Sequence, residues 1–147
     1  MMALTPFDDW EADLKPVARF PVEPKHKMPG KEAEYQSTFR SLLRYAGPGI
    51  VSWGVPNAGK RGFKAQAQVK KEGITAGVFD EHYAWNHGIA FLEWKDGKGT
   101  MSDSQIDWGN AMVDRGFRVA CVRTPEFALA LFMEWGAPVK SINNEGN

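Results

Sequence analysis

The stretch ITAGVFDEHYAWNHGIAFLEWK, residues 74–95, contains two runs that favour β-strands on either side of the turn-forming cluster WNHG. We expect an antiparallel hairpin whose turn is centred between Asn86 and His87. In that register Asp80 lies directly opposite Glu93, with the Cβ atoms about 5 Å apart. The pattern therefore predicts that two carboxylates meet where the hairpin strands end.

Glu93 and Lys95 share one face of the second strand because strand side chains alternate. Two facing carboxylates repel each other unless a cation lies between them, and oxygen ligands suit Mg²⁺ or Mn²⁺. Lys95 is placed to orient or deprotonate a water, or to neutralise charge on a phosphate. Asp80, Glu93 and Lys95 together indicate phosphodiester hydrolysis. The alternative is a surface salt bridge between Glu93 and Lys95.

Residues 31–46, KEAEYQSTFRSLLRYA, carry apolar residues at helical spacing and precede Gly47-Pro48. At about 100° per residue, Glu32 falls within the apolar stripe and Glu34 falls outside it. We expect Glu32 to point toward the core and Glu34 toward water. The alternative for Glu32 is a hydrated first turn, where its charge favours the helix dipole.

The remaining elements follow from caps and turns. Ser102 and Gln105 form a capping-box pattern at the start of a helix that ends at Gly116. Thr124 and Pro125 open a final helix. Further segments are a strand at 49–55, a helix near 62–72, a strand at 117–123 and a short helix near 8–14. The order predicts an α/β fold, with helices flanking a small mixed sheet.

The composition limits the classes of function that we expect for this chain. Eighteen basic and eighteen acidic side chains cancel, which argues against binding nucleic acid through bulk charge. No apolar run approaches the length of a membrane-spanning helix, and the acidic N-terminus does not resemble a signal peptide, so we expect a cytoplasmic protein without membrane contact. The single cysteine, Cys121, lies in an apolar run and is expected to be a buried thiol.

Residues 58–71 contain five bases and no acid. They are either a solvated helix face or a surface that contacts phosphates. The second interpretation gives a set of DNA-binding candidates: Asn57, Lys60, Arg61, Lys64, Lys70, Lys71 and, at the cap of the later helix, Ser102. Asn57 has a simpler alternative role in the turn, and Gln105 has one as a cap.

Most of the chain, from Glu32 to about Trp135, resembles the VRR-Nuc branch of the PD-(D/E)XK nuclease superfamily. The segments that carry the resemblance, in order, are EAEYQ, PNAGKRG, KKEGITAGVFD, FLEWK and SDSQIDWGNAMVDRGFRVACVRTPEFA. The family usually has Gly-x-Pro-Asp-Leu where this chain has GVFDE. Phe79 therefore replaces the proline, and Glu81 follows Asp80 and should point to the opposite face.

The resemblance implies a restriction-endonuclease-like core over residues 31–136, with an irregular arm at 1–30 and a tail at 137–147. It implies a metal held by Glu32, Asp80, Glu93 and the backbone carbonyl of Trp94. Lys95 would be catalytic, and Gln105 would touch the lysine or the attacking water.

Stand-alone, virus-type members of this family act as homodimers on four-way junctions. The resemblance therefore implies a Mg²⁺- or Mn²⁺-dependent endonuclease for branched DNA, acting inside a host cell. Two alternatives remain: a non-catalytic DNA-binding or assembly protein that keeps the nuclease fold, and a restriction-type nuclease that reads duplex sequence.

Overall fold

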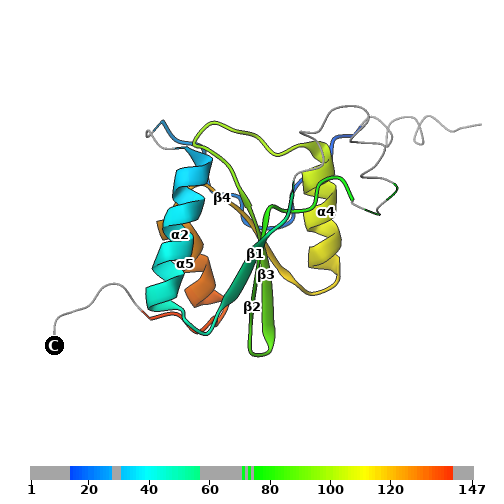
Figure 1. Cartoon of the computed structure of the whole chain (residues 1–147). Coiled ribbons are helices and arrows are strands. Elements are labelled where there is room, and N and C mark those ends of the chain that lie inside the picture. The colour runs from blue at the N-terminus through cyan, green and yellow to red at the C-terminus, as the bar shows by residue number, and fades with distance from the viewer. Residues whose placement is uncertain (1–13, 28–30, 57–70, 72, 74, 141–147) are drawn as a thin grey trace, which may run out of the picture.

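The computed structural model describes residues 14–27, 31–56, 71, 73 and 75–140 (Figure 1). Its centre is a four-stranded sheet in the order β1-β2-β3-β4. The strands are β1 (Val51–Gly54), β2 (Glu81–Trp85), β3 (Gly88–Trp94) and β4 (Arg118–Val122). β1 and β2 pair antiparallel, as do β2 and β3, whereas β3 and β4 pair parallel. The predicted small mixed sheet is therefore present.

The β2–β3 hairpin has the register expected from WNHG. Ala84 pairs with Ile89 and His82 pairs with Phe91. The turn is closed by a left-handed residue, His87, whose φ is 66°. β2 begins at Glu81, so Asp80 lies one residue before the paired strand.

In the described part of the chain, three helices flank the sheet. α2 (Glu32–Ala46) and α5 (Pro125–Glu134) cover one face, and α4 (Asp103–Asp114) covers the other (Figure 1). α4 begins with the predicted capping box. At the start of α5, the Thr124 hydroxyl accepts a hydrogen bond from the Phe127 amide at 3.3 Å. These local caps satisfy amides that have no partner within the helix.

Each face of the sheet has its own hydrophobic core. On the α2 and α5 side, Phe39 contacts the rings of Tyr83, Trp94 and Phe132 edge-on or tilted, with centroids 5.2–5.7 Å apart. On the α4 side the buried residues are Phe20, Phe79, Phe91, Val119 and Cys121. Burial of each large apolar side chain contributes about 1.5–3 kcal/mol. β3 is therefore fixed from both sides, and the position of its charged end is fixed with it.

Residues 20–23, within the predicted arm, lie along the outer edge of β4. Val22 forms a parallel bridge with Cys121. The Glu23 amide donates to the Cys121 carbonyl at 2.9 Å, and the Cys121 amide donates to the Pro21 carbonyl at 3.0 Å. This part of the arm has little regular structure but is bonded to the sheet. Residues of the predicted tail also pack: the Lys140 amide donates to the last residue of α2 at 2.7 Å.

The sequence did not reveal the role of Glu23, which is buried beside β4. Its carboxylate accepts hydrogen bonds from the amides of Arg123 and Thr124 and from the Thr124 hydroxyl, at 2.9–3.1 Å. Arg123 is also buried, and its guanidinium donates to carbonyls of Glu23, Asp96 and Gly99. The arm thus caps α5 from outside the helix.

Cys121 is fully buried, as expected, and burial raises the pKa of its thiol to about 12. The helices predicted near 8–14 and 62–72 lie outside the described residues, apart from Leu14 and Lys71. Among the helices described, none has the length and apolar character needed to cross a membrane.

Candidate metal centre

Three carboxylates from three parts of the chain meet at one end of the sheet. Glu32 is the first residue of α2, Asp80 immediately precedes β2, and Glu93 is the penultimate residue of β3. One oxygen from each lies within 4.8 Å of the other two. The structure therefore brings together the three side chains that the sequence predicted would share a cation.

Asp80 is held against the end of β3 by the backbone. The Trp94 amide donates to Asp80 Oδ1 at 3.3 Å, and the Asp80 carbonyl accepts from the Val55 amide at 2.8 Å. Glu32 is half-buried and Glu34 is exposed, as the helical phase predicts. The first turn of α2 therefore directs Glu32 toward the hairpin end.

Glu93 is the most buried of the three acids, with 2% of its surface exposed. Its Oε2 lies 3.7 Å from Lys95 Nζ, whereas its Oε1 is buried and has no hydrogen-bond partner within the described residues. A buried carboxylate oxygen without a partner is costly. A cation bound among these acids would satisfy that oxygen and neutralise the repulsion.

The electrostatics reflect this crowding. Burial, with repulsion from Glu93, raises the pKa of Asp80 to about 9. Burial also raises the pKa of Glu93 to about 7, although Lys95 opposes the shift. A divalent cation favours the ionised form of its ligands and displaces their protons. The all-oxygen donor set fits a hard cation such as Mg²⁺ or Mn²⁺.

Two other predicted participants have structural contacts of their own. Gln105 is buried, and its side-chain Oε1 accepts a hydrogen bond from the Ser102 backbone amide at 2.9 Å. The backbone amide of Gln105 donates to Ser102 Oγ at 3.2 Å. The capping role is thus present, and the contact with Lys95 or water remains a prediction. Trp94 has a fully buried ring, and the ligand role of its carbonyl also remains a prediction.

Five of the seven DNA-binding candidates fall on residues that the structure does not describe. Asn57, Lys60, Arg61, Lys64 and Lys70 lie outside the described residues. Lys71 is exposed, and Ser102 is exposed at the cap of α4. Their contacts with DNA remain predictions.

Glu81, one of the departures from the family pattern, forms a buried network that the sequence did not predict. Its carboxylate accepts hydrogen bonds from the Tyr83 hydroxyl, from Gln36 Nε2 at 2.9 Å and from Arg40 Nη1 at 2.5 Å. Trp94 Nε1 donates to the Tyr83 hydroxyl at 3.2 Å. Alternation indicated the face that Glu81 occupies, but its two donors on α2 lie more than 40 positions away. The network ties α2 to both strands that carry the carboxylates.

The segment before Asp80 is fixed by packing on α4. Phe79 is fully buried, with its ring centroid 5.6 Å from that of Phe20 and 5.1 Å from that of Trp108. Gly77 has φ of 86°, and a Cβ there would lie 2.1 Å from the Ser104 carbonyl oxygen. Packing of Phe79 thus replaces the rigidity that proline would provide at this position.

Comparison of the chain with family models, with curated proteins and with solved structures gave no match.

Proposed function

We propose that this protein is a divalent-metal-dependent endodeoxyribonuclease with a restriction-endonuclease-like core of the VRR-Nuc type. The observation that carries the proposal is the meeting of Glu32, Asp80 and Glu93, with oxygens within 4.8 Å of one another. Lys95 Nζ stands 3.7 Å from Glu93. Supporting evidence comes from the α/β sheet, whose hairpin presents aspartate, glutamate and lysine at one end.

In this proposal Glu32, Asp80 and Glu93 hold Mg²⁺ or Mn²⁺. When bound, the metal supplies a water of lowered pKa and neutralises charge on the scissile phosphate. Lys95 is 17% exposed, so its ammonium borders both the carboxylates and solvent. It donates hydrogen bonds to the attacking water or to a phosphate oxygen, and its charge favours the phosphorane-like transition state. The Glu81 network keeps the strand ends in register for this chemistry.

The substrate assignment rests on the resemblance. Branched DNA, including four-way junctions, is the proposed substrate, and a homodimer would place two sites on a two-fold symmetric junction. The proposed location is the cytoplasm of a host cell.

Cleavage of labelled junction, flap and duplex DNA tests the proposal. With Mg²⁺ or Mn²⁺ we expect wild type to cut branched DNA, and Lys95→Ala to lower the rate at least about 100-fold. Lys98→Ala is the matched control, because Lys98 is exposed three residues further on. Equal rates for wild type and Lys95→Ala would contradict the mechanism. DNA binding with no metal-dependent cutting of any substrate would favour the non-catalytic alternative.

A further inference from the structure

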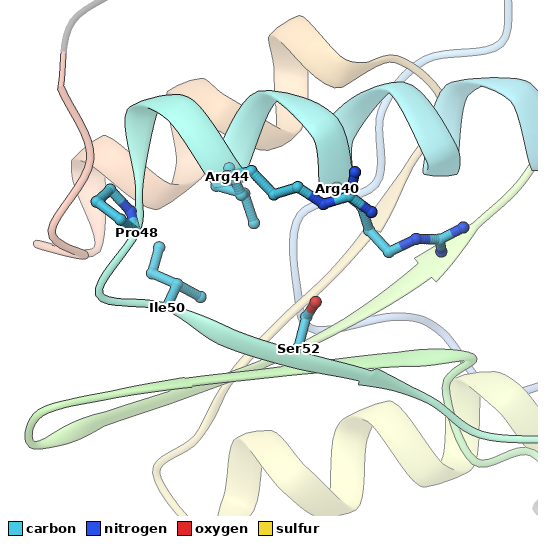
Figure 2. Close-up of a pocket in the computed structure, with 6 residues that line it drawn as sticks. Arg40, Arg44, Pro48, Ile50 and Ser52 are labelled. Atoms are coloured by element: carbon cyan, nitrogen blue, oxygen red, sulfur yellow. The ribbon is translucent and has the colours of Figure 1, made fainter.

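A cavity of about 460 Å³ lies between α2 and β1, in a part of the molecule that the carboxylates do not line. Ile50 is half-buried and Pro48 is exposed, so these two residues give the cavity apolar surface, whereas Leu43 is almost fully buried beneath it. Figure 2 shows the Ser52 hydroxyl pointing from β1 toward α2. The lining residues are Arg40, Leu43, Arg44, Pro48, Ile50 and Ser52. The volume lies within the usual range for sites that bind small ligands.

The cavity carries a positive charge that the described protein does not neutralise. Arg40 pairs with Glu81 at 2.5 Å. Arg44 lies one turn further along α2, is exposed, and makes no hydrogen bond or ion pair with any described residue. Two like charges four residues apart disfavour the helix slightly. An anion beside Arg44 and Ser52 would relieve that repulsion and accept from both side chains.

The cavity is connected to the carboxylates by one ridge of α2. Glu32, Gln36, Arg40 and Arg44 follow at intervals of four residues and form one ridge of the helix. Each step turns the ridge by about 40°, so it winds about 120° around the helix axis between Glu32 and Arg44. The distance from Glu32 to Arg44 is about 18 Å at a rise of 1.5 Å per residue. Figure 2 shows both arginine side chains extending away from Pro48, toward the N-terminal end of the helix, where Glu32 stands.

We propose that this cavity binds one nucleotide of a single-stranded DNA segment that runs along α2 to the metal centre. Arg44 and Ser52 hold a phosphate, and Pro48 and Ile50 contact the sugar and base. The direction of the strand rests on the proposed nuclease function. Among the branched substrates proposed above, the cavity favours flaps, which carry an unpaired arm, over four-way junctions, whose arms are all paired.

A single strand fits better than a duplex for a steric reason. The apolar surface lies between a helix and an edge strand, where one unpaired nucleotide can enter. A base pair cannot leave its stack without an additional cost of a few kcal/mol. Single-strand binders commonly combine a positive groove with aromatic side chains that stack on the bases. Here Arg44 supplies the charge, and aliphatic side chains supply the contact surface.

Fluorescence anisotropy with labelled oligothymidylate of about ten nucleotides tests the inference. All proteins carry Lys95→Ala in the presence of Mg²⁺, so that the DNA stays intact whether or not the parent protein cuts it. Arg44→Ala is expected to weaken single-strand binding about tenfold at low salt and to reduce the salt slope by about 0.7. Arg115→Ala is the matched control, since Arg115 is an exposed arginine at the end of α4, on the other face of the sheet. We expect it to bind like the parent.

Three outcomes would overturn the inference: unchanged binding by Arg44→Ala, an equal loss with Arg115→Ala, or an equal loss for a duplex of the same length. Displacement of the oligonucleotide by equimolar thymidine monophosphate would instead assign the cavity to a free nucleotide. Cleavage by the parent protein is measured separately. If the parent protein cuts DNA but Arg44→Ala does not weaken binding, only the strand path is refuted. If binding depends on Arg44 but the parent protein cuts no DNA, only the nuclease function is refuted.

Discussion

At the scale of single residues, the candidate metal centre holds buried carboxyl groups, which folding alone disfavours. Asp80 and Glu93 are carboxylates with raised pKa values, and one Glu93 oxygen has no partner within the described part of the chain. Neighbouring Glu81 is more buried still, yet it has three donors. The contrast between a carboxylate satisfied by the protein and one with an unpaired oxygen supports the proposal that Asp80 and Glu93 bind a ligand.

The raised pKa values predict how stability depends on pH without metal. The folded protein holds protons on Glu93 up to about pH 7 and on Asp80 up to about pH 9, whereas unfolded carboxyls lose them near pH 4. The folded state therefore binds more protons between these values, and its stability falls as pH rises. In EDTA, we expect Asp80→Asn to become progressively more stable than wild type from pH 5 to pH 9.

Thermal unfolding checks this prediction, and the comparison between two proteins cancels other titrations, such as that of His82, whose pKa burial lowers. Mn²⁺ should raise the melting temperature of wild type, and more so at pH 8 than at pH 6. Parallel pH profiles for wild type and Asp80→Asn would show that the Asp80 carboxyl is not perturbed.

At the scale of elements, the position of Asp80 depends on how its loop packs against α4. Gly77 and Gly116 have nearly the same positive φ, 86° and 84°. A Cβ at Gly77 would meet the backbone of Ser104 and Gln105, whereas a Cβ at Gly116 would meet no atom within 4 Å. The two glycines therefore separate conformational strain from steric contact.

Gly77→Ala is expected to cost more than about 3 kcal/mol of unfolding free energy, because strain and backbone overlap combine. Gly116→Ala should cost about 1–2 kcal/mol, from the left-handed conformation alone. Urea unfolding measures both. Gly77→Ala should also weaken Mn²⁺ binding, since its loop leads to Asp80. Equal costs for the two variants would mean that the loop does not rest on α4 as described.

Local signals in the sequence account for much of this element structure. WNHG predicted the hairpin register, and Ser102 with Gln105 predicted the start of α4. The helical phase of Glu32 predicted that it lies beside the hairpin. The Glu81 network was missed because its donors on α2 are distant in sequence, and alternation indicates a face but not a partner. From the sequence, Phe79 is only a replacement for the family's proline, because its packing against Phe20 depends on the position of the distant arm.

At the scale of the whole molecule, residues 20–23 bond to β4 and to the start of α5, which are distant from them in sequence. Glu23 caps α5 and accepts from residues 100 and 101 positions away. A contact at that separation leaves no periodic pattern in the sequence. The four-stranded sheet is therefore extended at its β4 edge by residues that composition assigns to an irregular arm.

Glu23→Ala is expected to lower the unfolding free energy by about 2–4 kcal/mol, because buried amides and the Thr124 hydroxyl lose a charged acceptor. Glu23→Gln should lose less, since it keeps one acceptor oxygen. Lys25→Ala, at an exposed residue two positions later, should change stability by less than about 0.5 kcal/mol. Urea denaturation of the three variants measures these differences. A Glu23→Ala protein as stable as Lys25→Ala would show that the arm does not hold α5.

The most direct test of the central claim is calorimetric titration of the metal-free protein with Mn²⁺ near pH 7.5. The account predicts saturable binding by wild type, with release of protons. Binding should be lost in Asp80→Asn, weakened in Glu32→Gln, and unchanged in Glu34→Gln, which removes the same charge from an exposed position in the same helical turn. Mn²⁺ binding of equal affinity in wild type and Asp80→Asn, or no saturable binding by wild type, would contradict the assignment of these carboxylates as a metal centre.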